Sequence, residues 1–177
     1  LVGVHSVQNA LAAAAAGIVC GMTLGEVAAG LAQAGQTQRL VVRTAANGAT
    51  LLDDTWNASP ASVLASLGVL AETTGRHVAV LGDMLELGQY EQQGHEKVGI
   101  RAAEVADEIV LIGERSKVTQ SAILSTGFKA SKVHWFSDAQ AAAAFLETVL
   151  KEGDTTLIKG SHSMHMDQII AALEVRS

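Results

Sequence analysis

The chain has 177 residues, of which 49% are hydrophobic, 17% charged and only 3% aromatic, and its formal net charge at pH 7 is -6. This composition predicts a folded chain with an aliphatic core, long enough for one domain or for one domain with a piece of another. The acidic balance, with no cluster of Lys or Arg, argues against nucleic acid and against an anionic membrane as partners. The single cysteine, Cys20, excludes an intramolecular disulfide and fits a cytoplasmic location.

Two helices are predicted first, over residues 5–19 and from Thr23 to about residue 34. The first is rich in Ala and ends at Gly21, and Thr23 with Glu26 forms a capping box that starts the second. Two short helices cannot bury each other's apolar faces, so we expect them to be the end of a domain whose body lies upstream. The chain begins without Met, which suggests that Leu1 is not a natural start. The predicted domains are residues 1–37 and 38–177.

From residue 39 onward the pattern changes to alternating strands and helices. A strand over residues 40–44 and a return strand over 50–53 flank Asn47-Gly48, a strong hairpin signal. Ser137 with Gln140 reads as a capping box. The remaining predicted strands cover 77–81, 108–112, 132–136 and 155–158, and the predicted helices 60–74, 89–106, 116–125, 137–151 and 164–175. This alternation predicts an α/β, Rossmann-like, mostly parallel sheet with helices on both faces and an antiparallel edge hairpin.

Polar residues follow several of these strands, where the carboxyl ends of a parallel sheet meet and ligands bind. They are Asp53-Asp54, Asp83, Gly113-Glu114-Arg115 and Lys159-Gly160-Ser161. Ser59 and Pro60 open the helix after the first of these groups. Gly160 and Ser161 are predicted to precede a helix N-terminus, which would favour an anion. The sequence contains neither of the Gly-rich motifs that cradle a triphosphate or a dinucleotide.

Each of these residues also has a purely structural interpretation. Asp favours turns, so one carboxylate of the Asp53-Asp54 pair is equally consistent with a loop cap. Trp56 is expected to pack rather than to stack on a ligand. His95, in a polar helix, is expected on the surface. His162 and His165 lack a third ligand at a suitable spacing, so no metal site is predicted.

Taken in order, the motifs resemble the Mur ligases, and within them the branch that adds D-alanyl-D-alanine. The likeness covers nearly the whole chain and rests on Gly3 to Ala13, Gln38-Arg39-Leu40, Asp53 to Pro60, Leu81 to Gly88 with His95, and Lys159-Gly160-Ser161. It implies the last helices of a central ATPase domain followed by a C-terminal Rossmann-like domain. Three positions differ from the usual pattern: Ser6 stands where Asn is usual, Trp56 where Tyr is usual, and His162 where Arg is common.

The resemblance implies an ATP-dependent ligase that works through an acyl phosphate and joins D-alanyl-D-alanine to a UDP-N-acetylmuramoyl-tripeptide. It implies contacts to ATP from His5, Asn9, Arg39 and Asp54. It implies contacts to the peptide substrates from Asn57, Ser59, Lys159, Gly160 and Ser161. The phosphate-binding lysine and the Mg²⁺ ligands of the family would lie upstream of Leu1, so no catalytic residue is expected within this chain. We therefore expect the isolated chain to be inactive, and a monomer.

Two other functions remain open at this level. Receiver domains of signalling systems also place an acid pair, a later Asp and a Lys after successive strands, as Asp53-Asp54, Asp83 and Lys159 do. The preceding hairpin and the long separation between Asp83 and Lys159 argue against a receiver. A non-catalytic fragment that serves as an interaction domain is the third possibility.

Overall fold

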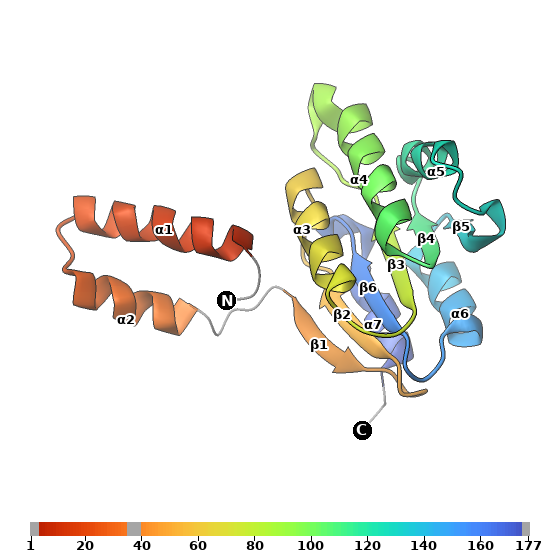
Figure 1. Cartoon of the computed structure of the whole chain (residues 1–177), viewed down its shortest axis with the longest axis horizontal. Coiled ribbons are helices and arrows are strands. Elements are labelled where there is room, and N and C mark those ends of the chain that lie inside the picture. The colour runs from red at the N-terminus through yellow and green to blue at the C-terminus, as the bar shows by residue number, and fades with distance from the viewer. Residues whose placement is uncertain (1–3, 35–39, 175–177) are drawn as a thin grey trace. The chain divides into compact units, whose positions relative to one another are not determined.

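The computed structural model describes residues 4–34 and 40–174 (Figure 1). The chain divides into two compact units, Leu1–Arg39 and Leu40–Ser177, which are described separately below. Within the described ranges, every helix is too short or too polar to cross a membrane. The predicted domain boundary at residue 37 lies outside the described residues.

The first unit is a pair of helices, α1 (Val4–Val19) and α2 (Leu24–Ala34). Gly21 lies between them with a φ of 90°, a backbone conformation that favours glycine. The predicted capping box is confirmed, because the Thr23 N–H donates to Glu26 Oε2 at 2.8 Å and the Glu26 N–H donates to Thr23 Oγ1 at 3.3 Å. Large apolar side chains of this unit are exposed, namely Val7, Leu11, Ile18, Val19, Met22 and Leu24.

The second unit is built on a six-stranded sheet with the order β1-β2-β6-β3-β4-β5. Strand β1 pairs with β2 in antiparallel orientation, and all other pairs are parallel. This confirms the predicted fold class, including the antiparallel edge hairpin. The strands are β1 (Val41–Thr44), β2 (Thr50–Asp54), β3 (His77–Gly82), β4 (Glu108–Ile112), β5 (Val133–Phe136) and β6 (Thr155–Lys159). The helices are α3 (Pro60–Ala71), α4 (Glu91–Val105), α5 (Ser116–Ser125), α6 (Ala139–Val149) and α7 (Asp167–Leu173).

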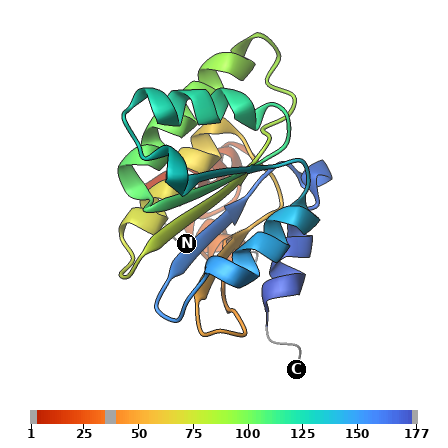
Figure 2. The same cartoon turned by 90° about the vertical axis from the view of Figure 1, so that its right-hand side faces the viewer.

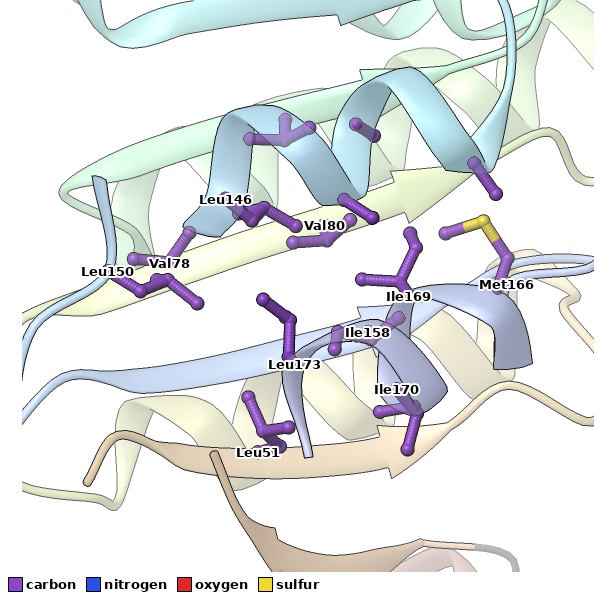
Figure 3. Close-up of a cluster of buried hydrophobic side chains, with 14 of the residues drawn as sticks. Leu51, Val78, Val80, Leu146, Leu150, Ile158, Met166, Ile169, Ile170 and Leu173 are labelled. Atoms are coloured by element: carbon purple, nitrogen blue, oxygen red, sulfur yellow. The ribbon is translucent and has the colours of Figure 1, made fainter. Parts of the chain in front are cut away.

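Helices cover both faces of the sheet and create two separate apolar cores. Helices α6 and α7 pack on one face, where Leu146, Ile169 and Leu173 meet Val80 and Ile158 (Figures 2 and 3). Helices α3, α4 and α5 pack on the other face through Val63, Leu67, Val98 and Ile123, among others. Because successive strand residues point to opposite faces, the central strands must be apolar at nearly every position.

Three helix starts differ from the sequence prediction by two residues or more. Helix α4 begins at Glu91 rather than at residue 89, because a 3₁₀ helix, Gly88–Tyr90, precedes it. Asp138, not Ser137, caps α6, because its carboxylate accepts the Ala141 N–H at 2.9 Å. The final helix begins at Asp167 rather than at residue 164. A short 3₁₀ helix, His162–Met164, comes first, and His165 then adopts a left-handed conformation with a φ of 51° that interrupts helical geometry.

Candidate functional site

The carboxyl ends of β2, β6 and β3 form a topological switch point. Strand β6 lies between β2 and β3. The helices that follow β2 and β3 lie on one face of the sheet, and α7, which follows β6, lies on the other. The connections therefore leave in opposite directions, and ligands of open α/β sheets bind beside such points. The predicted convergence of polar strand ends is confirmed here, since Asp54 and Leu81 are both in register with Lys159.

Asp54 and Lys159 form a buried ion pair across β2 and β6. The Lys159 Nζ lies 2.6 Å from Asp54 Oδ2, and the two side chains are 2% and 8% exposed, respectively. Ser66, one turn into the buried face of α3, also donates to Asp54 Oδ2 at 2.6 Å. Lys159 additionally donates to the backbone carbonyl oxygen of Asn57 at 2.7 Å. The pair therefore connects two strands, a helix and the loop that follows β2.

The neighbouring Asp53 points elsewhere because side chains alternate along a strand. Its carboxylate accepts from Arg43 Nε at 2.8 Å and from Thr55 Oγ1 at 2.8 Å. Arg43 also contacts Glu174 at 3.1 Å. The hydrogen bond that Arg43 donates to Asp53, followed by the one that it donates to Glu174, raises the pKa of the Arg43 guanidinium. Asp53 therefore connects the edge strand β1 to the start of the loop, whereas Asp54 binds Lys159. The two adjacent acids have different structural roles.

The loop of residues 55–59 presents polar and aromatic side chains to solvent. Asn57 and Ser59 are exposed. The predicted helix start at Ser59 and Pro60 is confirmed, because Ser59 Oγ accepts the Ser62 N–H and Pro60 is the first residue of α3. Trp56 is 62% exposed, and its ring centroid lies 4.9 Å from that of His162 at an interplanar angle of 47°. Trp56 thus packs with a tilted ring against an exposed histidine and remains largely accessible to solvent.

Gly160 and Ser161 join the ends of β6 and β3. The Ser161 N–H donates to the Asp83 carbonyl oxygen, and Ser161 Oγ accepts the Leu85 N–H at 2.9 Å. A Cβ on Gly160 would lie 2.8 Å from Met166 Cγ, so only glycine fits there. The predicted anion site directly after Ser161 is wrong in one respect. No α-helix starts at that point in the described chain, since α7 begins six residues later.

The loop after β3 is held by two buried side chains. Asp83 Oδ1 accepts the Ser116 N–H at 2.8 Å and so caps the start of α5. His95 is only 1% exposed, which corrects the expectation of a surface histidine. Its ring contacts Thr119 Oγ1 at 2.9 Å and the Met84 backbone at 3.4 Å. Burial lowers the pKa of His95, although the hydrogen bond to Met84 acts in the opposite direction.

The predicted site residues fall into three groups. Asp54, Asn57, Ser59, Lys159, Gly160 and Ser161 come together at the switch point of the second unit. Asn9 lies exposed on α1 of the first unit, and His5 falls on the same helix, although its side chain lies outside the described part. Arg39 also lies outside the described residues. Over the described ranges, no three His, Cys, Asp or Glu side chains are grouped to hold a metal ion.

Ser66 is the residue of this site that the sequence reading missed. It is 4% exposed and lies on the same buried face of α3 as Val63 and Leu70. A polar residue inside an otherwise apolar helical stripe was the available signal, because buried hydroxyl groups require a hydrogen-bond partner.

Comparison with known proteins places this α/β unit in a family. The Mur ligase, glutamate ligase domain matches residues 38–162, and the chain therefore belongs to the Mur ligase family. The chain is 36% identical to the UDP-N-acetylmuramoyl-tripeptide–D-alanyl-D-alanine ligase of Escherichia coli, over 98% of the chain and 38% of that protein. It is 35% identical to the Mycobacterium leprae ligase of the same name, over 97% of the chain and 37% of that protein.

Solved structures agree with this assignment. A MurF from Acinetobacter baumannii superposes with a TM-score of 0.77 at 33% identity, covering 97% of this chain and 37% of that one. A MurF ligase from Thermotoga maritima in complex with ADP gives a TM-score of 0.64 at 29% identity, covering 76% and 30%. The resemblance expected from the sequence is thus confirmed. The chain spans 37 to 38% of the length of the two relatives named above.

Proposed function

We propose that this chain is the C-terminal part of an ATP-dependent ligase that adds D-alanyl-D-alanine to a UDP-N-acetylmuramoyl-tripeptide. The observation that best supports this proposal is the group of polar residues at the switch point, which we call the polar rim. It lies within the segment that matches the Mur ligase family and consists of Asp54, Asn57, Ser59, Lys159, Gly160 and Ser161. In the proposed reaction, the terminal carboxylate of the tripeptide takes the γ-phosphoryl group of ATP. The amine of the dipeptide then attacks the acyl carbon, and phosphate leaves. Holding both reactants in place can contribute several kcal/mol to such a reaction.

The polar rim is better suited to binding the peptide substrates than to binding the triphosphate of ATP. Asn57 and Ser59 are exposed and carry amide and hydroxyl groups suited to a peptide substrate. The described residues of the rim provide no set of backbone N–H groups with an exposed cation for a triphosphate, since the Lys159 ammonium is buried against Asp54. We therefore assign triphosphate and Mg²⁺ binding to the part of the ligase upstream of this chain.

The residue roles follow from this division. His5, Asn9, Arg39 and Asp54 are proposed as contacts to ATP, and a MurF ligase that is 29% identical to this chain was solved in complex with ADP. Asn57 and Ser59, with the wall formed by Lys159, Gly160 and Ser161, are proposed for the peptide side. Residues 1–37 are proposed to be the end of the central ATPase domain. The exposed apolar side chains of α1 and α2 support this proposal, because a helix pair with such a face needs a partner.

A receiver-like phosphoacceptor is the weaker alternative. A receiver needs an accessible carboxylate, whereas the Asp54 side chain is 8% exposed and bound to Lys159 and Ser66. Asp83 is buried and caps α5. The geometry therefore favours the ligase.

A chimera tests the proposed function directly. The C-terminal 38% of the Escherichia coli ligase would be replaced by this chain. The readout is phosphate release that requires both the UDP-linked tripeptide and D-alanyl-D-alanine. We expect an active chimera and an inactive isolated chain. A chimera built with the matching part of the Mycobacterium leprae ligase is the control. An inactive chimera beside an active control would overturn the proposal, and ligation by the isolated chain would overturn its predicted inactivity.

A further inference from the structure

The loop of residues 55–59 has an unusual anchor. Loops commonly hold their shape by local hydrogen bonds, and this loop has several, including the Thr55 N–H to Asp53 Oδ1 at 3.3 Å. Its central carbonyl, that of Asn57, instead accepts a hydrogen bond from Lys159 Nζ at 2.7 Å. This donor belongs to a residue 102 positions further along the chain. The middle of the loop is thus tied to the end of β6.

The anchor is itself fixed in position. Lys159 ends β6, which lies between β2 and β3. Its ammonium group is held by Asp54 Oδ2 at 2.6 Å, and that oxygen also accepts from Ser66 Oγ at 2.6 Å. A charge-assisted hydrogen bond of this kind is stronger than a neutral one, and burial increases its strength. The loop carbonyl is therefore bound to a group that has very little freedom to move.

The loop in turn carries the exposed side chains of the rim. The side chains of Trp56 and Asn57 are exposed, although the Asn57 carbonyl oxygen is held by the buried ammonium group of Lys159. The Trp56 ring contacts the ring of His162, which lies in the 3₁₀ helix that follows β6. An indole that is 62% exposed and yet positioned on an anchored loop is preorganised for contact.

We infer that Lys159 is a positioning residue, whose buried ammonium group holds the Asn57 carbonyl so that residues 55–59 present Trp56, Asn57 and Ser59 in one fixed arrangement. Lys159 thus acts on the substrate side through the loop. The inference deepens the proposed function and rests on it for the identity of the substrate. The positioning itself can be tested in the 177-residue chain without any ligase activity.

The test measures the loop in the folded state. Trp135 is replaced by phenylalanine so that Trp56 is the only fluorophore of its kind, and amide hydrogen exchange is followed for residues 55–59. Lys159→Met removes the donor. Because it also leaves Asp54 buried without its cation, the double variant D54N/K159M provides a charge-balanced version. D54N alone retains the bond from Lys159 to the Asn57 carbonyl.

We expect amide exchange in the loop to accelerate at least tenfold, and the Trp56 emission to change, in K159M and in D54N/K159M. D54N alone is expected to accelerate exchange by less than either Lys159 variant, because it keeps the donor to the Asn57 carbonyl. Glu108→Gln is the matched control, because it removes a buried carboxylate at the opposite end of the sheet and should leave the loop unchanged. A general loss of stability would instead accelerate exchange throughout the chain, in proportion to the loss of stability of each variant, and not in residues 55–59 alone.

Loop exchange and Trp56 emission that stay at parental values in D54N/K159M would overturn the inference. In the chimeric ligase, K159M, which leaves the proposed ATP contact Asp54 in place, should raise the KM for D-alanyl-D-alanine by more than it lowers kcat. An inactive chimera would refute the proposed function and leave the loop measurement valid, so the two failures can be distinguished.

Discussion

Buried carboxylates with cationic partners occur at both ends of the sheet, and the two clusters differ in what they hold. At the carboxyl ends, Asp54 and Lys159 are 8% and 2% exposed, and Lys159 also binds loop backbone. At the amino ends, Glu108 is 6% exposed and accepts from Arg76 at 2.6 Å, from His134 at 2.8 Å and from Lys132 at 3.1 Å. Buried carboxylates with cationic partners therefore hold a loop at the carboxyl ends of the strands and join the starts of neighbouring strands at the amino ends.

Access to water explains why the difference matters. Arg76 and Lys132 are 27% and 47% exposed, so their charges remain partly hydrated if Glu108 is lost. Arg76 would also keep Asp154 at 3.0 Å. The Lys159 and Asp54 side chains are only 2% and 8% exposed, so water cannot hydrate either charge to the same extent if the other is lost. The loss of one partner from a fully buried ion pair strongly reduces stability, whereas the same loss from a partly exposed network has a smaller effect.

The largest expected effect is that of Lys159→Met on stability. Leaving the Asp54 carboxylate buried without its cation should reduce the free energy of unfolding by about 3–5 kcal/mol. Adding Asp54→Asn should recover part of this loss, because the uncompensated charge is removed. Urea denaturation of the two variants measures both values. A loss below about 1 kcal/mol for K159M would mean that the pair behaves like a surface ion pair.

Glu108→Gln should have a smaller effect, about 1–3 kcal/mol, because it removes charge-assisted hydrogen bonds but leaves a polar group in place. Equilibrium unfolding at pH 7 gives the value, with the parent chain as the reference. If E108Q destabilised the chain more than K159M, the comparison between the two ends of the sheet would be reversed.

The pH dependence of stability separates the two ends in another way. Burial acts against ionisation of Glu108, but the hydrogen bonds from Lys132, His134 and Arg76 outweigh it and lower the pKa of this carboxyl below its ordinary value of 4.5. The stabilisation is therefore present above pH 4.5 and is lost as the pH falls through the lower, folded-state pKa. E108Q should flatten this acid limb of the stability profile.

His95, near the carboxyl ends of the strands, is expected to reduce the stability at a higher pH than Glu108 does. Its pKa is lowered from 6.5 by burial, so the unfolded chain takes up a proton first as the pH falls below that value. Stability should thus begin to decline below about pH 6.5 and should do so equally in E108Q. Unfolding followed from pH 8 to pH 3 tests this, and a decline that begins only below pH 4.5 would contradict the assignment to His95.

The smallest expected effect concerns Thr156, in the middle of β6. Its hydroxyl oxygen is buried and has no hydrogen-bond partner within the described structure. Thr156→Val keeps the branched shape and removes the unsatisfied group, so it should raise the free energy of unfolding by about 1 kcal/mol. Thermal denaturation of this single variant is sufficient, and a destabilised variant would show that the hydroxyl group is satisfied in solution.

The helices and strands of this protein could be predicted from local patterns in its sequence. Alternation of apolar strands and helices predicted the parallel sheet, Asn47-Gly48 the hairpin, and Ser59-Pro60 the start of α3, because each depends on interactions between residues close in the chain. The error at Ser137 arose where the adjacent Asp138 offered a competing cap. His95 was misplaced because a polar helix gives no local sign that one of its polar residues is buried.

Which residues contact one another at the candidate site depends on the three-dimensional arrangement of the strands. Nothing local distinguishes Asp53 from Asp54, yet one binds Arg43 at the sheet edge and the other binds Lys159, 105 residues away. That pairing exists because β6 returns to lie between β2 and β3, and the return depends on α6 and α7 covering the opposite face of the sheet. The strand order, set by the burial of both faces, therefore determines how the loop at the candidate site is held.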